Sequence, residues 1–531
     1  MDGLDLLRLE CRDKDIRNGG GFRAIARVDR YLGLRETIRK MELKNPLKCD
    51  VTLEDAALMY LAARILFPSS VLELPDRIKA AVIPEELGIN PEHITPDLFY
   101  RMLDKFTVEI QEEIIKRVNR EILNRFKWDF LYMQGNYRFE IASALGEELK
   151  EALLADIDTT IVHFEGKKCD LVKRCYNAAN PAQIHGVKLV LAQMRSIKLP
   201  LFFPVVAGNA ADVKQFRPTV MELEKLYPGE RFIFTLDRAM FDGEDLKYAA
   251  EKHIVIIGGK LTKRVKEMWP KEEGFRLVKS ELVPAGTTLK KYNVYAARKK
   301  VYFEEYKGEL EAHFFYDEAR ADRERAENQV KASAMAQLRS KIEAMLLSEK
   351  GQKKLTKKLT KQIQAELGPL ARQYKIDLKL MVEKIWNGEA IEEVDEDKWC
   401  GRFLLYSTSP KLKSSTVLEY YRGHAVVEEG VKTLKQTLEI RPVYLWNADR
   451  VRAYIFLVGM AYLFLSVILF CLPEKERRVD PSRFAEQRLN FTGEITRDKQ
   501  GKKFVSEYIV DLNYILNQID QKFKNSSQRH T

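Results

Sequence analysis

The pattern of apolar residues changes near residue 150, and this change constrains the fold more than any other feature of the 531-residue chain. Before it, apolar residues recur every three or four positions in segments such as LEDAALMYLAARILF and TPDLFYRMLDKFTVEIQEEIIKRVNREILNRF, which predicts amphipathic helices. The chain is also longer than the roughly 250–300 residues that one hydrophobic core organises. We therefore expect an all-helical N-terminal domain over residues 1–145, followed by domains of another class.

After residue 150, short apolar runs alternate with helical ones. Strands are predicted for LLADIDTTIVHFE, KLVLAQMRS, LPLFFPVVAG, RFIFTLD and HIVIIGG. Helices are predicted for DVKQFRPTVMELEKLY and GEDLKYAAEKH. Strands followed by helices indicate an α/β sheet with some parallel pairing, which here starts with a meander. This part of the sheet is expected over residues 146–270.

A different composition separates this region from a second α/β stretch. Residues 271–400 hold alternating segments such as KKYNVYAARKKVYFEEY, then a long charged helix from EARADRERAENQ onward, and an acidic loop at Glu392 to Asp397. The strand GRFLLYST then resumes the sheet, and a helix starts at Ser415. We expect a β-rich and helical insertion over 271–400, a second sheet portion over 401–475, and a C-terminal segment over 476–531.

The charge balance favours a polyanionic partner. Lys and Arg number 89 against 78 Asp and Glu, which gives a formal charge of +11 and a sequence pI near 9.0. Basic proteins gain affinity for nucleic acids when counterions leave the phosphates. Many basic proteins of this size never bind DNA, so charge alone leaves both readings open.

Six cysteines are scattered along the chain without a Cys-x-x-Cys pair, which predicts reduced thiols. The N-terminus lacks the basic start and apolar run of a secretion signal, so a cytoplasmic location is expected. Cys169 and Cys175 lie near His163 and His185 in the sequence and suggest a zinc site. Because their spacing fits no common zinc pattern, ordinary packing is the favoured interpretation.

One segment is long and apolar enough to cross a membrane. Ala453 to Leu472, AYIFLVGMAYLFLSVILFCL, carries no charged residue. Positive residues flank both ends, so they give no orientation bias, and no second segment of this kind exists. A fully buried core helix is the preferred interpretation, and no membrane contact is expected.

Two acids occur in similar settings on predicted strands. Asp158 lies within LLADIDTTIVHFE, and Asp237 ends RFIFTLD just before a turn and a helix. Carboxylates on strands of one sheet can converge on one point, and Mg²⁺ prefers such oxygen ligands together with phosphate oxygens of the substrate. Acids at strand ends are also common turn residues, which is the alternative.

A third acid lies in YYRGHAVVEEGVKTLKQTLEI. On an ideal helix with Tyr421 at zero, His424 falls at about 300°, Glu428 at about 340° and Lys435 at about 320°, whereas Glu429 falls at about 80°. The first four side chains share one stripe, which borders a predicted buried face of Val427, Val431, Leu434 and Leu438. This geometry selects Glu428 over its neighbour, although a solvated face of mixed charge also explains the pattern.

This segment resembles the signature Tyr-x2-Arg-x3-Glu-x6-Lys of a large family of DDE-type insertion-sequence transposases. Tyr421, Glu428 and Lys435 stand at the matching positions. His424 occupies the place of the signature arginine, and Arg422 is close by. The tail EIRPVYLWNADRVRAYIFL is also similar to the family and leads into the apolar segment, which favours a core helix there.

Three further segments resemble motifs of the same family. DTTIVHFEG is similar to the first-acid motif and points to Asp158 over Asp156. LDRAMFDGEDL is similar to the second-acid motif and points to Asp237. AGNAADVKQF resembles the turn between them, with the residues Gly208, Asn209 and Asp212. The motifs occur in the family's order, with room for an insertion before the third acid.

The resemblance implies a fold, cofactors and partners. The fold would be a ribonuclease-H-like mixed sheet with flanking helices, interrupted by the β-rich and helical insertion. Asp158, Asp237 and Glu428 would be the catalytic and metal-binding residues for two divalent ions, Mg²⁺ or Mn²⁺. Double-stranded DNA, as terminal inverted repeats and target, would be bound by a homodimer at the nucleoid. The DNA-contacting residues would be Tyr421, Arg422, His424 and Lys435.

Two alternatives to an active transposase remain. A catalytically inactive, transposase-derived DNA-binding protein is compatible with the unusual His424 but not with the intact acids. A membrane-anchored protein would use the apolar segment that starts at Ala453. Solubility of the full chain without detergent separates this last possibility from the other two.

Overall fold

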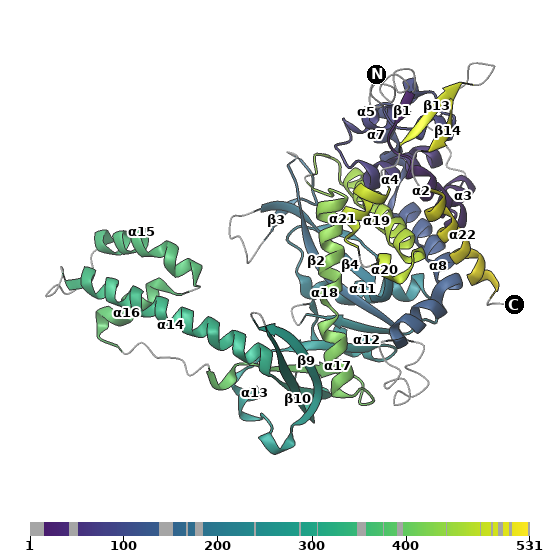
Figure 1. The fold of residues 1–531 in the computed structure, drawn as a ribbon. Helices are drawn as coiled ribbons and strands as arrows, with labels where there is room; N and C mark the ends of the chain where they lie inside the picture. Colours follow the sequence, from purple (N-terminus) through teal and green to yellow (C-terminus); the bar gives the residue numbers. More distant parts are fainter. Residues whose placement is uncertain are drawn as a thin grey trace.

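The computed structural model is described here for 15–41, 51–136, 152–165, 168–175, 184–237, 240–285, 288–304, 306–347, 357–374, 376–389, 397–441, 443–477, 479–489, 492–497, 503–508 and 512–528. The predicted domain boundary at 145 and most of the acidic loop from Glu392 lie outside these residues. The described part forms a mixed sheet with helices around it and a helical arm that projects from one end (Figure 1).

The centre of the molecule is a mixed sheet whose strand order confirms the predicted ribonuclease-H-like class. β2 pairs antiparallel with β4 and parallel with β7, and β7 pairs parallel with β8. The short strands β3, β5 and β6 pair with β4, as the predicted meander requires. The bounds are β2 Leu153–His163, β3 Lys173–Cys175, β4 Ile184–Met194, β5 Leu199–Phe202, β6 Val205–Ala207, β7 Phe232–Leu236 and β8 Ile254–Gly259.

The β-rich segment extends this sheet and does not form a separate one. Strand β12 pairs antiparallel with β8, and the ladder continues through β11 and β10 to β9. Sequence periodicity identifies such strands but does not specify their partners. The bounds are β9 Arg276–Ala285, β10 Thr288–Phe303, β11 Gly308–Asp317 and β12 Arg402–Ser407.

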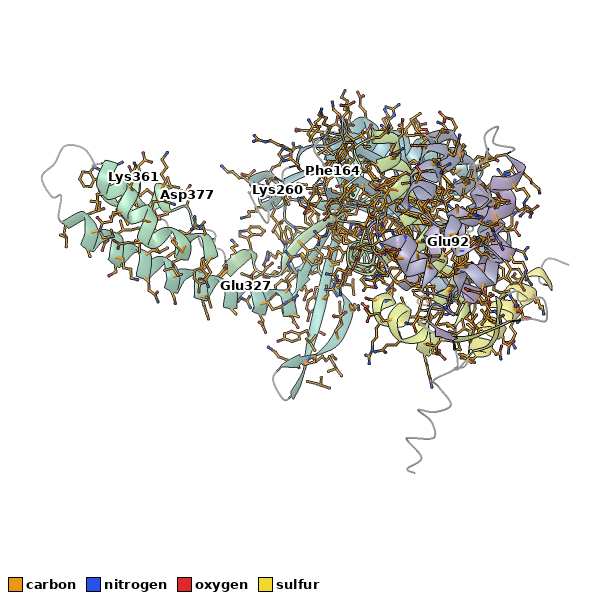
Figure 2. All side chains as sticks on the ribbon, turned by 90° about the horizontal axis from the view of Figure 1, so that it is seen from above. Glu92, Phe164, Lys260, Glu327, Lys361 and Asp377 are labelled. Carbon is orange, nitrogen blue, oxygen red and sulfur yellow. The ribbon has the colours of Figure 1, made fainter. Side chains whose placement is uncertain are left out.

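A helical arm is inserted between β11 and β12. Its three helices enclose a small apolar core of their own, which includes Leu338, Ile363 and Met381. Figure 2, in which Glu327, Lys361 and Asp377 are labelled, shows the arm extending away from the rest of the molecule. The arm consists of α14 Glu318–Leu346, α15 Lys357–Gln373 and α16 Leu378–Asn387.

Helices cover both faces of the central strands. On one face, Phe216 of α11 packs edge-on against Phe234 of β7, with ring centroids 6.0 Å apart. On the other face, the next residue of β7, Thr235, approaches His424 at the start of α18. The two faces follow from the alternation of side chains along a strand. These helices are α11 Phe216–Leu226, α12 Gly243–Ala250, α17 Ser414–Arg422 and α18 Ala425–Lys432.

The uncharged apolar segment forms α19, Ala448–Cys471. Within the described residues it is the one helix that passes a length and composition test for a membrane span, and 94% of its most apolar stretch is buried. It packs against α2, α4, α7, α8, α22 and β5. The expectation of a core helix is therefore met in the structure.

The N-terminal region is helical, as predicted, with one exception. Strand β1 forms a small antiparallel sheet with the C-terminal strands β13 and β14. The C-terminal helix α22 returns to the same region, where Tyr31 and Phe523 stack with centroids 4.3 Å apart. The bounds are β1 Asp15–Arg17, α2 Phe22–Leu32, α3 Leu34–Lys40, α4 Leu53–Leu66, α5 Leu74–Lys79, α6 Ile83–Leu87, α7 Pro96–Lys105, α8 Val108–Asn136, α20 Glu474–Arg477, α21 Pro481–Arg488, β13 Gly493–Arg497, β14 Lys503–Tyr508 and α22 Leu512–Gln528.

Candidate active site

The pairing of β2 with β7 brings the first two acids together. The parallel register places Asp156 opposite Thr235. Two residues further along each strand direction stand Asp158, within β2, and Asp237, directly after β7. Residues two apart on a strand face the same side, so both carboxylates lie on the face that α17 and α18 cover. The register of β2 with β7 therefore places Asp158 and Asp237 near each other although they are far apart in the sequence.

The pKa of Asp158 responds to both of the other acids. Burial raises the pKa of its carboxyl group, and the negative charges of Asp237 and Glu428 raise it further. The backbone N–H of Thr159, which donates to Asp158 Oδ1 at 2.7 Å, and the charge of His424 oppose this shift. The net shift is upward, as expected for a partly buried carboxylate among like charges.

Asp156, which the sequence interpretation set aside, has a different environment. Its side chain is fully buried, and Arg195 Nε donates to Asp156 Oδ2 at 2.8 Å. Burial disfavours the charged form, but hydrogen bonds from Arg195 and His424 outweigh it and lower the pKa of Asp156. An acid whose oxygens are already bound in this way is a structural group. Asp158, by contrast, is only half-buried and accepts a hydrogen bond from the backbone N–H of Thr159.

The predicted helix over the third acid is divided into three parts. α17 ends at Arg422, and α18 begins at Ala425 after a tightened turn in which His424 N–H bonds Tyr421 O at 3.0 Å. A π-helical turn then spans Thr433–Thr437. One rotation of 100° per residue therefore does not hold along the whole segment, although Val427, Leu434 and Leu438 are buried as predicted.

Glu428 and Asp237 line one cavity of about 790 Å³. Tyr421 and His424 lie on the same wall, and the facing wall comes from β9, β11 and the start of α14. Glu429 is directed elsewhere, since its carboxylate is paired with Lys198. The structure therefore separates the two adjacent glutamates as the sequence predicts, and it places Glu428 on the side of Asp237.

Tyr421 reaches the second acid from the end of α17. Its hydroxyl lies 3.5 Å from Asp237 Oδ1, and burial together with the Asp237 charge raises the pKa of Tyr421 to about 12. The phenol is therefore a neutral donor at physiological pH. Gly258 of β8 makes room for it, because a Cβ atom there would lie 2.4 Å from the Tyr421 hydroxyl oxygen.

His424 and Arg422 are both engaged by acids of the protein. His424 Nδ1 lies 3.3 Å from Asp156 Oδ1. Burial lowers the pKa of His424, but the hydrogen bond to Asp156 and the surrounding carboxylates produce a net rise. Arg422 pairs with Glu281 at 3.1 Å and also with Asp317. Both side chains line the cavity, and these partners bind them in the DNA-free chain.

Lys435 lies in the π-helical turn and close to the first acid. Burial and the charge of Arg441 lower the pKa of the Lys435 ammonium group, while the carboxylate of Asp158 acts in the opposite direction. The side chain is partly buried. π-helical turns often occur at functional sites. Lys435 is therefore within electrostatic reach of Asp158.

The turn that contains Gly208, Asn209 and Asp212 supports β2 from the other face. Asp212 Oδ1 accepts hydrogen bonds from Thr159 Oγ1 at 2.7 Å and from Lys188 Nζ at 2.6 Å. Thr159 follows Asp158, so its side chain points to the opposite side of the strand. Gly208 is buried in this turn and Asn209 is exposed.

Sequence patterns did not identify Arg195, Thr235 or Gln193 as parts of the site. Gln193 Nε2 donates to Val426 O of α18 at 3.3 Å, and its Oε1 accepts from Tyr462 of α19 at 2.8 Å. These residues lie in apolar segments, where a single polar residue gives no spacing signal. A polar residue in a predicted buried strand is a hint, because such groups need partners.

The carboxylate oxygens of Asp158, Asp237 and Glu428 are the kind of ligand that a hard cation prefers. Within the described residues, no three His, Cys, Asp or Glu side chains stand close enough around one point to hold a metal, including the two cysteines and two histidines considered for zinc. The trio is nevertheless close enough for Asp237 and Glu428 to raise the Asp158 pKa. Three carboxylates that repel one another fit Mg²⁺.

Comparisons with known proteins identify a protein family that matches this chain. A model of the transposase DDE domain matches residues 150–464. No curated protein matches. Among solved structures, the chain is similar to one titled as the cryo-EM structure of a piggyBac transposase synaptic complex with hairpin DNA, with 12% identity, 88% of this chain and 77% of that chain covered, and a TM-score of 0.33. That score supports no argument about the fold, which rests on the strand order.

The matched region contains all the elements that carry the three acids. It extends from just before β2 into α19 and includes the strands β9, β10 and β11 as well as the helical arm. It also covers more than half of the chain. The resemblance inferred from the sequence motifs is thereby confirmed at the level of the family, and the chain belongs to the transposases with a DDE domain.

Proposed function

We propose that the protein is a metal-dependent enzyme that cuts DNA at the ends of a transposable element and joins those ends to target DNA. The proposal is supported by the β2–β7 register, which sets Asp158 and Asp237 on one face of the sheet, and by the cavity that Asp237 shares with Glu428 of α18. Their mutual influence is expressed in the raised pKa of Asp158.

The three carboxylates would hold two divalent ions, Mg²⁺ or Mn²⁺. Such ions, when bound, favour attack by an oxygen nucleophile and stabilise the leaving oxygen. The protonation state of Asp158 affects this metal site. Asp158 keeps its proton to a higher pH than an ordinary aspartate, because it is partly buried among like charges. It must be ionised to act as a ligand.

Tyr421 and Lys435 would orient the DNA backbone. The neutral Tyr421 hydroxyl beside Asp237 can donate to a phosphate oxygen, and the Lys435 ammonium beside Asp158 can neutralise one. Hydrolysis would break a P–O bond and leave a 3′-hydroxyl at the element's end. That hydroxyl would then attack a target phosphodiester and release the target's own 3′-oxygen. No covalent protein intermediate is needed.

His424 and Arg422 are both bound by carboxylates of the protein. Each side chain would have to leave its carboxylate partner before it could contact DNA. His424 faces Asp156, and Arg422 faces Glu281 and Asp317. In this proposal His424 mainly orients Asp156. A phosphate that displaced Glu281 or Asp317 would free Arg422 for DNA.

The partner and setting follow from the same proposal. Double-stranded DNA would be bound as inverted-repeat ends and as target, with the helical N-terminal region contacting the ends. The net charge of +11 supports a phosphate-rich partner. A homodimer acting on paired ends in the cytoplasm, at the nucleoid, completes the proposal, and the C-terminal segment is a candidate for dimer or DNA contact.

Asp237→Ala is expected to leave end binding within about twofold of the wild type, since most binding energy comes from phosphate contacts elsewhere. Cleavage should fall by on the order of a thousandfold or more, because the trio acts as a unit. The measurement is gel retardation and Mg²⁺-dependent cutting of a DNA that carries the inverted repeats found beside the gene. Asp170→Ala, which changes an exposed acid in the loop before β3, is the control.

Two outcomes would count against the proposal. Normal cutting by Asp237→Ala would exclude this residue from the site. End binding without any cutting by the wild-type chain, under all divalent ions, would favour a DNA-binding protein that has lost catalysis.

A further inference from the structure

We propose that Arg195 is a positioning residue that fixes the three acid-bearing elements relative to one another. This inference rests on the proposed function, because it concerns the same trio. Arg195 opens the turn directly after β4, and within the described residues it makes no hydrogen bond to Asp158, Asp237 or Glu428. Its guanidinium instead contacts β2, β7 and α17, the helix that directly precedes the Glu428-bearing α18.

Three contacts define the role. Arg195 Nε donates to Asp156 Oδ2 of β2 at 2.8 Å, and Nη2 binds the other oxygen of that carboxylate. Nη2 also donates to Thr235 Oγ1 of β7 at 2.6 Å. Nη1 donates to the carbonyl oxygen of Tyr420 near the end of α17. One planar cation thus joins two strands and the helix that leads to α18.

Two of the three partners of Arg195 lie two residues from an acid, and the third belongs to the helix that precedes α18. Asp156 and Thr235 precede Asp158 and Asp237 by two residues on their strands, or roughly 7 Å at about 3.3 Å per residue. Tyr420 precedes Glu428 across the tightened turn between α17 and α18. A shift of any one element would therefore move its acid away from the others. Arg195 opposes all three shifts at once.

The surroundings are shaped for this guanidinium. The Arg195 side chain is only 11% exposed, and that of Asp156 is fully buried. Gly423, in the turn after α17, lies against Arg195, and a Cβ atom there would stand 2.5 Å from Nη1. Gly423 has φ −68°, which any residue can adopt, so contact with Arg195 and not backbone strain selects glycine. Bidentate, planar contacts of this kind are specific to arginine.

A buried ion pair that serves stability alone is the competing explanation. Removing one partner leaves an uncompensated charge and destabilises the fold, so a single substitution cannot separate the two roles. Replacing both charges by apolar residues of similar size avoids that penalty. The test therefore uses the double variant Arg195→Met with Asp156→Leu. Gly423→Ala is the second variant, which keeps both charges and only displaces the guanidinium.

The measurement is Mn²⁺ binding to the full, DNA-free chain by electron paramagnetic resonance, together with the thermal unfolding midpoint. Loss of a group that orients metal ligands lowers affinity by roughly 10- to 100-fold. We expect a weakening of that size in both variants, with cooperative unfolding retained. The matched control is Lys198→Met with Glu429→Leu, which removes an exposed ion pair close by in sequence and should change affinity by less than about twofold.

The outcomes separate this inference from the proposed function. If the wild type binds Mn²⁺ and folded variants of Arg195 and Gly423 bind it equally well, the positioning role is wrong while the site stands. If the wild type neither binds Mn²⁺ nor cuts DNA, the proposed function fails and this inference with it. Should the double variant not fold, Gly423→Ala decides alone: wild-type affinity there overturns the inference.

Discussion

Glu428→Gln is expected to lower cleavage of the element's ends by on the order of a thousandfold, because the trio acts as a unit. Glu429→Gln, one residue later, should stay within about twofold of the wild type, since an exposed ion pair contributes little. Glu428 lines the cavity that also contains Asp237, whereas Glu429 is paired with Lys198. Both substitutions remove one charge from the same helix, so each controls for the other.

The measurement is the single-turnover cutting rate with Mg²⁺ on DNA bearing the ends. Binding to the same DNA is measured alongside, because neither variant should change it by more than about twofold. Equal losses in the two variants would mean that helix charge matters and not the placement of Glu428. A larger loss in Glu429→Gln would assign the third acid to the wrong residue.

Asp158→Asn is expected to abolish cutting and at the same time stabilise the metal-free protein by roughly 0.5–2 kcal/mol, in the way that active-site charges often oppose stability. The amide keeps the size of the side chain but removes a charge that is partly buried and repelled by Asp237 and Glu428. Mg²⁺ should raise the unfolding midpoint of the wild type, because a ligand of the folded state stabilises it. The unfolding midpoint of Asp158→Asn should rise less than that of the wild type when Mg²⁺ is added.

The stability that Asp158→Asn gains over the wild type increases with pH. The folded-state pKa of Asp158 is above its ordinary value of 3.8, so the folded protein binds that proton more tightly than the unfolded chain does. Stability from this group is present below 3.8 and is lost as the pH rises through the folded-state pKa. The advantage of Asp158→Asn should therefore be full at neutral pH and disappear toward 3.8. Thermal unfolding in a chelator at several pH values measures it, and a variant less stable than the wild type at neutral pH would contradict this explanation.

The sequence predicted those features that depend on local pattern. The uncharged run from Ala453 became the buried α19, because a helix apolar on all sides must be enclosed. Asp158 and Asp237 were identifiable as acids on strands, and parallel pairing of β2 with β7 brought them together. Glu428 was separated from Glu429 by helical rotation, which held over the single step from one residue to the next.

Features that depend on long-range contacts could not be predicted. The helix over the third acid is interrupted at Gly423 and His424, where Asp156 and Thr235 contact the imidazole of His424. Ser414, the first residue of α17, contacts His313 Nδ1 at 2.9 Å. Arg195 has no local signal at all, since its partners come from β2, β7 and α17. The sheet partner of β11 likewise depends on register and not on periodicity.

Convergence of the acids on shared metal ions is tested most directly by iron-promoted cleavage of the protein chain. Fe²⁺ replaces Mg²⁺ in the folded, DNA-free protein, ascorbate and peroxide generate hydroxyl radicals at the bound ion, and the fragments are sequenced. Cuts should appear together near Asp158, Asp237 and Glu428 and should decrease when excess Mg²⁺ is added. Cuts near only one of these acids, or at sites that Mg²⁺ does not protect, would show that the three carboxylates do not share a metal site.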